Sequence, residues 1–181
     1  MNEIRERFER TALPFMQALY HLGLRLTRNP EDSSDLVQDT YLRAYQKFSS
    51  FSEGTNCKAW LFTIMYSIFV NRYRKQQREP VVMSPDDIEK RFGDLLAVPS
   101  ESEVEPSPGT SEVEKALEEL PEIFRTPVIL VDLEEFTYEE AAQILSCPVG
   151  TVRSRLFRSR KLLYVALKEY ARKLGYEGER K

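Results

Sequence analysis

Apolar residues recur at helical spacing over both ends of the chain, and no run of alternating apolar and polar residues indicates strands. A first helix is predicted over residues 3–28, ending before Asn29-Pro30. Asn29 suits the N-cap of the next helix and Pro30 its first position. The pattern predicts an all-α protein.

The helix after Pro30 has two distinct faces. The face predicted to be buried carries Val37, Tyr41, Ala44, Tyr45 and Phe48. The opposite face carries Asp35, Asp39, Leu42 and Gln46. A leucine between acids on an outward face is either accidental or part of a partner-docking surface, and both interpretations stay open here.

Residues 58–70 are apolar almost all round, which predicts a central helix. The helix continues into NRYRKQQR, and residues 58–78 hold five basic residues and no acidic one. One interpretation is a solvated helix end whose cations offset the helix dipole. The other is a nucleic-acid surface, because cations neutralise phosphates and aromatic rings stack on unpaired bases.

The middle of the chain has a different composition. Residues 81–111 hold two basic and seven acidic residues, several prolines and the run SESEVEPSPGTS. This composition is typical of a flexible linker, with one short helix possible near residues 86–95. We therefore expect two small helical domains, residues 1–80 and 112–181, joined by an acidic linker at 81–111.

The C-terminal part ends in a predicted helix-turn-helix. A capping-box pattern at Ser111–Glu114 begins its first helix, and Thr137–Glu140 begins a later one. A break at 146–148 precedes the basic helix GTVRSRLFRSRKLL. Its packing side carries Val152, Leu156, Ser159 and Leu163. The opposite side carries Ser154, Phe157, Arg158 and Lys161, with Arg153 and Arg160 on one flank and Arg155 on the other.

An aromatic residue on a charged face is poorly explained by core packing. Arginine can bind guanine through two hydrogen bonds, and phenylalanine can contact a thymine methyl group. Insertion into the DNA major groove is therefore favoured over a merely solvated basic helix.

The net charge of −3 is a cancellation between segregated blocks. Residues 112–140 hold ten acidic and two basic residues, whereas residues 141–181 hold three acidic and ten basic ones. Such asymmetry is consistent with nucleic-acid contact.

Other classes of protein find little support. Two distant cysteines and one histidine do not supply a zinc site of usual ligand count, so we expect no bound metal. The sequence has no glycine-rich phosphate loop and no nucleophile motif, so we expect a protein that has no cofactor and is not an enzyme. The apolar run at 59–70 is too short to span a bilayer, and the N-terminus lacks a signal-peptide core. We expect a cytoplasmic protein without membrane insertion.

Three strings together resemble extracytoplasmic-function (ECF, group 4) sigma factors of the sigma-70 family: NPEDSSDLVQDTYLRAYQKFSSF, AWLFTIMYSIFVNRYRKQQREP and TYEEAAQILSCPVGTVRSRLFRSRKLL. They occur in the family's order and separation, covering nearly the whole chain outside the linker. The resemblance implies a promoter-specificity subunit of bacterial RNA polymerase, nucleoid-associated when active, with sigma region 2 in the N-terminal domain and region 4 in the C-terminal one.

The resemblance also implies three sets of site residues. Core polymerase, through the clamp helices of its largest subunit, would bind Asp35, Leu36, Gln38, Asp39 and Leu42, and its flap is a further expected contact. The −10 promoter element would be opened and read by Phe51, Asn56, Trp60, Ser67, Asn71, Arg72, Arg74 and Lys75. The −35 element would be read by Thr151, Arg153, Ser154, Phe157, Arg158 and Lys161.

One residue departs from the family pattern. Many members carry an asparagine seven residues after the tryptophan, here Trp60, whereas this chain has Ser67. Serine offers one hydroxyl in place of an amide, so the preferred −10 bases are expected to differ.

The resemblance further implies regulation, in a stress response. An anti-sigma factor would cover the docking surfaces, and NRYRKQQREP is similar to members whose anti-sigma factors are redox-sensitive and bind zinc. Free in solution, the two domains could also close on each other. The alternative function is a dimeric helix-turn-helix transcriptional regulator with an N-terminal sensor domain, which would bind duplex DNA without polymerase.

Overall fold

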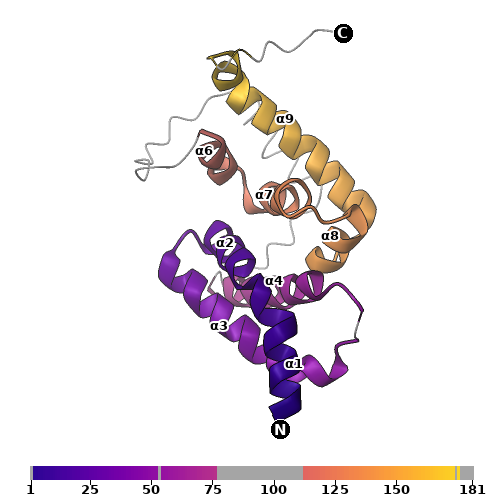
Figure 1. Ribbon diagram of the computed structural model, residues 1–181. Coiled ribbons are helices and arrows are strands. Elements are labelled where there is room, and N and C mark those ends of the chain that lie inside the picture. The colour runs from indigo at the N-terminus through magenta and orange to yellow at the C-terminus, as the bar shows by residue number, and fades with distance from the viewer. Residues whose placement is uncertain (1, 53, 77–111, 174, 176–181) are drawn as a thin grey trace.

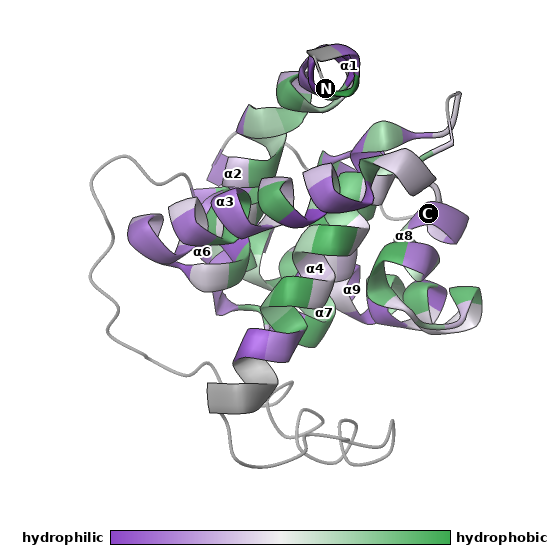
Figure 2. Cartoon of the chain, turned by 90° about the horizontal axis from the view of Figure 1, so that it is seen from below, coloured by the Kyte–Doolittle hydropathy of each residue, from purple (hydrophilic) through white to green (hydrophobic). Residues whose placement is uncertain are grey.

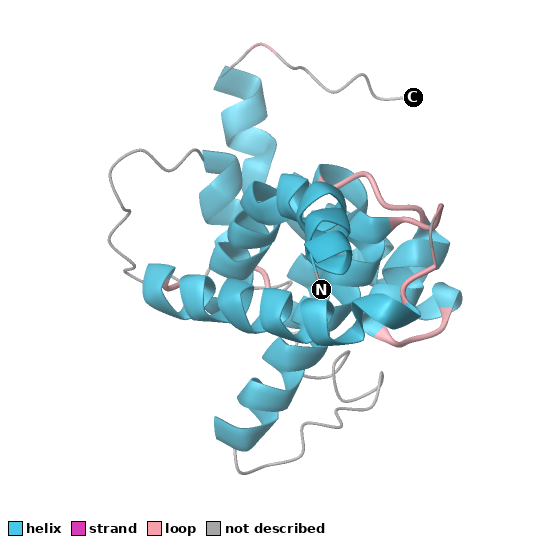
Figure 3. Cartoon of the chain, turned by 60° about the horizontal axis from the view of Figure 1, so that its bottom comes forward, coloured by secondary structure: helices cyan, strands magenta, loops and turns pink. Residues whose placement is uncertain are grey.

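The computed structural model describes residues 2–52, 54–76, 112–173 and 175. Every regular element among them is a helix, so the predicted all-α class is confirmed (Figure 3). The predicted linker at 81–111, the short helix near 86–95 and the cap at Ser111 lie outside the described residues. Within the described residues, no helix is long and apolar enough to cross a membrane.

The chain begins with α1 (Asn2–Ala12), the 3₁₀ turn η1 (Leu13–Phe15) and α2 (Met16–Thr27). The prediction of one continuous helix over 3–28 is wrong in its middle. Pro14 lies in the first turn of η1. Proline has no N–H to donate and its ring crowds the preceding turn, so the helix is interrupted there.

Helix α3 (Pro30–Lys47) begins as predicted. Asn29 Oδ1 accepts hydrogen bonds from the backbone N–H groups of Glu31, at 2.8 Å, and Asp32, at 3.1 Å. The following 3₁₀ turn is η2 (Phe48–Ser50). Val37, Ala44 and Phe48 are buried as predicted. Tyr45 was also predicted to be buried but is 42% exposed, with its ring edge-on to Phe8.

Helix α4 (Cys57–Gln76) is central, as predicted. Leu61, Phe62 and Met65 are fully buried, and the helix contacts α1, α2, α3 and α8. Figure 2 shows α4 among the other helices, with hydrophobic residues along much of its length.

The C-terminal part comprises α6 (Glu112–Glu119), α7 (Glu122–Val128), a π-helical turn η4 (Ile129–Leu133), α8 (Tyr138–Leu145) and α9 (Val149–Lys173). The wide turn closes with a 2.9 Å bond from Glu134 N–H to the Ile129 carbonyl. The Thr137–Glu140 capping box forms as predicted. Ser146 ends α8 with φ 50°, and the last helix runs about ten residues beyond Leu163.

The two parts pack on each other rather than standing apart. Their buried residues form one hydrophobic core, in which the Phe62 ring of α4 meets the Phe136 ring edge-on, with centroids 5.1 Å apart. Figure 1 shows α7 and α8 directly beside the N-terminal helices. The most extensive contact between the two parts is that of α4 with α8. A hydrogen bond from Asn56 to Glu140 joins the starts of these two helices.

Candidate functional site

The outward face of α3 forms the first candidate surface. Asp35, Gln38 and Leu42 are exposed, and Leu42 keeps 61% of its surface in contact with solvent. We call these residues, with Asp39, the docking face. Beside it lies a hollow of about 220 Å³ lined by Asp39, Leu42, Arg43, Gln46 and Ile68. An exposed leucine next to a hollow and flanked by acids is suited to a partner with an apolar contact and basic groups.

Leu36 does not belong to this face. Its side chain is 1% exposed, on the same side of α3 as the buried Ser33 and Thr40. In this structure Leu36 supports the docking face from the core, and its direct contact with polymerase stays a prediction.

Asp39 is paired within the molecule. Its carboxylate accepts a hydrogen bond from the Arg72 guanidinium of α4, and both side chains are nearly half exposed. The pair joins a residue predicted to bind polymerase with one predicted to bind DNA.

The loop before α4 contains the aromatic residue predicted to capture a base. Phe51 is only 9% exposed, stacked on Phe48 at 5.8 Å and packed against Trp60 at 4.9 Å between centroids. The ring is therefore part of the core in this structure, and its role in capturing a base stays a prediction. Contact with a base would require this loop to move.

The remaining residues of the predicted −10 set follow α4. Trp60 is half-buried, while Ser67, Asn71 and Arg72 are exposed on later turns. Trp60, Ser67 and Asn71 are spaced seven and four residues apart, which places them along one side of the helix. Arg74 and Lys75 belong to α4, but their side chains lie outside the described set.

Asn56 connects the two parts of the molecule. Its Oδ1 accepts a hydrogen bond from Ala59 N–H at 3.1 Å, which caps α4. Its Nδ2 donates to Glu140 Oε1 at 2.7 Å. Because Glu140 also accepts from Thr137 N–H, the caps of α4 and α8 are bonded to each other.

Helix α9 has the predicted two-sided character. Val152, Leu156 and Ser159 are buried, and Ser159 Oγ donates to the Phe124 carbonyl at 2.8 Å. On the other side, Phe157 is 73% exposed. The other predicted −35 residues are exposed or half-buried: Thr151, Arg153, Ser154, Arg158 and Lys161.

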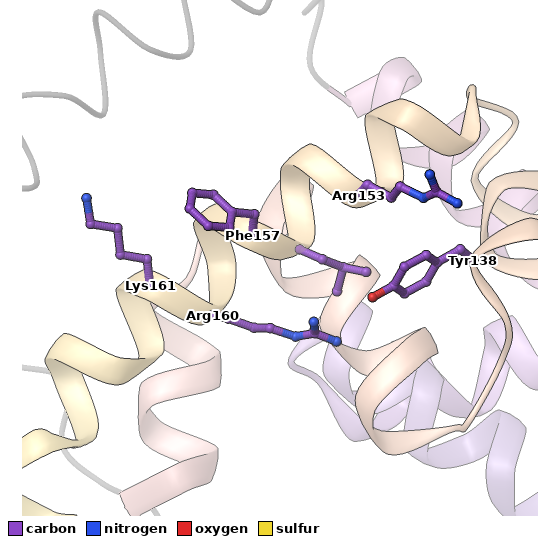
Figure 4. Close-up of a pocket in the computed structure, with 6 residues that line it drawn as sticks. Tyr138, Arg153, Phe157, Arg160 and Lys161 are labelled. Atoms are coloured by element: carbon purple, nitrogen blue, oxygen red, sulfur yellow. The ribbon is translucent and has the colours of Figure 1, made fainter. Parts of the chain in front are cut away.

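Tyr138 and Asp132, which the sequence did not single out, contact arginines of α9. The Arg153 guanidinium lies 5.8 Å from the centre of the Tyr138 ring, and Figure 4 shows that ring between Arg153 and Arg160. Arg160 donates two hydrogen bonds to Asp132, at 2.6 and 3.2 Å, and these bonds raise its pKa. The predicted capping box drew attention to the start of α8 but not to the Tyr138 side chain.

These residues border a pocket of about 510 Å³, lined by Tyr138, Arg153, Leu156, Phe157, Arg160 and Lys161 (Figure 4). Its three cations and exposed aromatic ring suit a polyanion that also offers apolar groups. Duplex DNA, with phosphates and thymine methyl groups, has this chemistry.

The described residues contain no group of three or more His, Cys, Asp or Glu placed to hold a metal ion. Cys57 and Cys147 are free thiols, and burial raises the pKa of each. Neither is prepared as a thiolate nucleophile.

Comparisons with known proteins agree with this arrangement. Family models described as Sigma-70 region 2 and Sigma-70, region 4 match residues 14–79 and 110–163. The chain is 37% identical over 164 residues to the ECF RNA polymerase sigma factor EcfG of Rhodopseudomonas palustris, covering 85% of this chain and 82% of that protein. It is 32% identical to SigE of Mycolicibacterium smegmatis, covering 80% of this chain and 55% of the relative.

A solved structure is also similar, that of the sigma factor RpoE in complex with the anti-sigma factor NepR from Bartonella quintana. The TM-score is 0.65 with 32% sequence identity, covering 93% of this chain and 98% of that one. Both conserved regions match in order, and the similarity to EcfG extends over most of both chains. The chain belongs to the ECF family of RNA polymerase sigma factors.

Proposed function

We propose that this protein is an alternative sigma factor that binds core RNA polymerase and directs initiation at its own set of promoters. The observation that carries the proposal is one chain with two separate surfaces of opposite character. The docking face on α3 is acidic around an exposed leucine, whereas α9 presents Phe157 among cations. A sigma factor needs both surfaces, since it must hold polymerase and promoter together.

In this function, Asp35, Gln38, Asp39 and Leu42 bind the clamp helices of the polymerase largest subunit. Leu42 supplies the apolar contact, and the carboxylates attract basic groups of the partner. Asp39 must then release Arg72 and pair with a basic group of polymerase instead.

The −10 element is contacted along α4. Trp60 supplies an aromatic face, while Ser67, Asn71 and Arg72 supply hydrogen bonds and charge to the separated strand. Arg74 and Lys75 extend the basic character towards the helix end. Because Ser67 has only a hydroxyl, we expect the base preference at its position to be weaker than that of an amide.

The −35 element is contacted by α9 in the major groove. Arg153, Ser154, Phe157 and Lys161 are exposed for this contact and Arg158 is partly exposed, while Thr151, in the first turn of the helix, would contact a phosphate. Phosphate contacts fix the register and base-edge contacts select the sequence.

The protein is further proposed to be held inactive by an anti-sigma factor until a stress signal arrives. Support comes from the similarity to RpoE, which was solved with the anti-sigma factor NepR. A zinc-binding partner stays a prediction from NRYRKQQREP. Action on the bacterial chromosome would place the active protein in the cytoplasm at the nucleoid, as an initiation factor without catalytic activity of its own.

The test is transcription in vitro with core RNA polymerase and fragmented genomic DNA of the source organism. With this protein, the sequenced 5′ ends should define promoters that share −10 and −35 elements. A failure to bind core would refute the proposal. Symmetric duplex sites bound without polymerase would instead support a dimeric regulator.

Matched variants separate the two surfaces. Asp39→Ala with Leu42→Ala should abolish core binding, whereas Phe157→Ala and Arg158→Ala should keep it and lower −35-dependent transcription by roughly 5- to 150-fold, as expected for a base contact. Gln17→Ala, an exposed change on α2, is the control. Equal loss of core binding by both sets would contradict this division.

A further inference from the structure

Helix α9 continues beyond the part of the chain that matches Sigma-70, region 4. That match ends at residue 163, whereas α9 ends at Lys173. Figure 1 shows the yellow end of α9 extending past α6. The residues assigned to the −35 element end at Lys161, so the last turns of the helix have no role in the function proposed above.

One face of α9 keeps its character through these last turns. Phe157, Lys161, Tyr164, Lys168 and Arg172 are spaced four, three, four and four residues apart, which places them within about 80° of one another around the helix. Figure 4 shows the first two projecting from adjacent turns. Tyr164 is 65% exposed, and Lys168 and Arg172 are exposed as well. We call Tyr164, Lys168 and Arg172 the α9 extension.

The other side of the same turns fixes how the α9 extension is presented. Leu163 packs against the hydrophobic core, and Leu167 and Tyr170 are half-buried. Helix α9 also contacts α6 and α7. Because packing holds one side of the helix, the exposed side has a defined direction.

The charge of this face favours a polyanion as its partner. Residues 149–173 hold eight basic residues and one acidic residue. Among the described side chains, Lys161, Lys168 and Arg172 form no ion pair with a carboxylate, unlike Arg160, which Asp132 holds. Cations that the protein does not neutralise itself are available for phosphates, and a tyrosine hydroxyl can donate to a phosphate oxygen.

The distance along the helix suits the backbone of a duplex rather than its base edges. With a rise of about 1.5 Å per residue, Lys168 lies about 17 Å and Arg172 about 23 Å beyond Phe157 along the axis. The major groove is about 12 Å wide, so a helix that places Phe157 against base edges carries these two side chains to the phosphates beside the groove. The C-terminal end of the recognition helix of homeodomains also contacts the DNA backbone.

We propose that the α9 extension is a further DNA-binding site, which binds phosphates of the duplex that adjoins the −35 element. Lys168 and Arg172 supply the charges, and the Tyr164 hydroxyl donates a hydrogen bond. The site adds affinity and fixes the register of α9 without selecting bases, because every sequence offers the same phosphates. The inference rests on the proposed function for its place beside the −35 element, but phosphate binding by this face is a property of the chain alone.

The experiment compares binding of the full chain and its variants to duplex DNA without polymerase. Fluorescence anisotropy with a 5′-fluorescein-labelled, mixed-sequence 30-base-pair duplex gives the association constant at several KCl concentrations. The slope of its logarithm against the logarithm of the KCl concentration reports the number of phosphate contacts. Lys168→Ala with Arg172→Ala should lower the magnitude of this slope by about 2, one for each lost contact.

Lys173→Ala is the matched control. It removes an exposed charge from the same last turn, but Lys173 lies about 160° around the helix from Phe157. Its slope should match that of the wild type. The proposal would be overturned by an equal slope for wild type and the double variant, by an equal reduction in Lys173→Ala, or by a wild type that does not bind the duplex at about 50 mM KCl.

A second measurement places the contact on a promoter identified by the transcription assay. Uncharged methylphosphonate linkages replace the phosphates on each side of the −35 element in turn. Holoenzyme with the wild type should bind one of these promoters roughly fivefold more weakly than the natural one, whereas the double variant should bind both equally. Equal weakening of both proteins would assign these phosphates to other residues and overturn the proposal.

The two measurements separate this inference from the proposed function. Inactivity of the wild type with core polymerase would count against the sigma function. The salt dependence of the free chain would still decide whether the α9 extension binds phosphates.

Discussion

Gly23 lies where α2 packs closely against Ser33 of α3. A Cβ atom built there would come within 2.5 Å of Ser33 Oγ, and Ser33 is fully buried with its hydroxyl donating to the Tyr20 carbonyl. Gly23→Ala should therefore lower the free energy of unfolding by about 1–3 kcal/mol through overpacking. Urea denaturation is the measurement.

Gly150 is the matched control for this change. It lies in the first turn of α9, and a Cβ atom there would meet nothing within 4 Å. Gly150→Ala should be neutral or stabilising by up to about 1 kcal/mol, because alanine is the better helix former. If Gly23→Ala destabilised the protein no more than Gly150→Ala, the packing of α2 on α3 would have room for a methyl group at Gly23.

Tyr138 illustrates a residue whose function depends on its neighbour. Its ring supports the Arg153 guanidinium, so Tyr138→Leu should weaken −35-dependent transcription by roughly two- to fivefold, the amount expected from an exposed cation–π contact. Tyr138→Phe keeps the ring and should restore most of the activity. The readout is the ratio of transcripts from promoters with intact and scrambled −35 elements; the same loss on both templates would argue for a general structural role.

The exposure of a single residue could be predicted where an apolar side chain lies among charged ones on a helix face. Phe157 on a charged helical face was expected outside, and it is 73% exposed. Leu36 and Phe51 were assigned to contacts from their place in family strings, yet both are buried. A string gives the position of a residue along the chain, whereas burial depends on which neighbours cover it.

At the scale of elements, the stability that the α8 capping box provides should depend on pH through the Glu140 carboxyl. Hydrogen bonds from Thr137 N–H and from Asn56 lower the Glu140 pKa below its ordinary value of 4.5. Because the folded pKa is the lower one, the stabilisation is complete above about pH 4.5 and is lost as the pH falls through the folded pKa. Glu140→Gln should therefore destabilise at pH 7, with the difference from wild type shrinking below pH 4.5.

Urea titrations at a series of pH values check this expectation. Glu139→Gln is the control, since Glu139 is the exposed neighbour in the same first turn. A Glu140→Gln deficit that stayed constant into acid would show that its charge is not what stabilises the cap.

Helix starts were more predictable than helix interiors. Asn29 and Thr137 each carry a side-chain oxygen that accepts hydrogen bonds from the turn that follows, so local chemistry determines the boundary. Pro14 itself indicated that the first helix would be interrupted, but the apolar periodicity on both sides of it led to the prediction of one continuous helix. The π-helical turn at Ile129–Leu133 had no clear signal, because it depends on how the segment joins Phe136 to the core.

For the whole molecule, the sequence predicted two parts that could close on each other, but it did not predict which residues meet. The contacts that join them pair Asn56 with Glu140 and Phe62 with Phe136, residues that are far apart in the chain. No local pattern states that a cation at Lys58 will meet a carboxylate at Glu134.

The shared core has a consequence for folding that one natural probe can detect. The chain has one tryptophan, Trp60, and it lies in the N-terminal part, so its fluorescence reports unfolding there. Phe136, 4% exposed, belongs to the C-terminal part but packs on Phe62. Phe136→Ala should therefore lower the urea midpoint seen by Trp60, with a loss of up to about 3–5 kcal/mol for a buried aromatic ring.

Leu133→Ala is the control, because it also shortens a hydrophobic side chain just before the contact but is 42% exposed. It should leave the Trp60 transition nearly unchanged. If the parts were independent, Phe136→Ala would destabilise only its own part, and the Trp60 midpoint would match that of the wild type. A shift specific to Phe136 would instead show that the N-terminal helices draw stability from the C-terminal ones through the shared core.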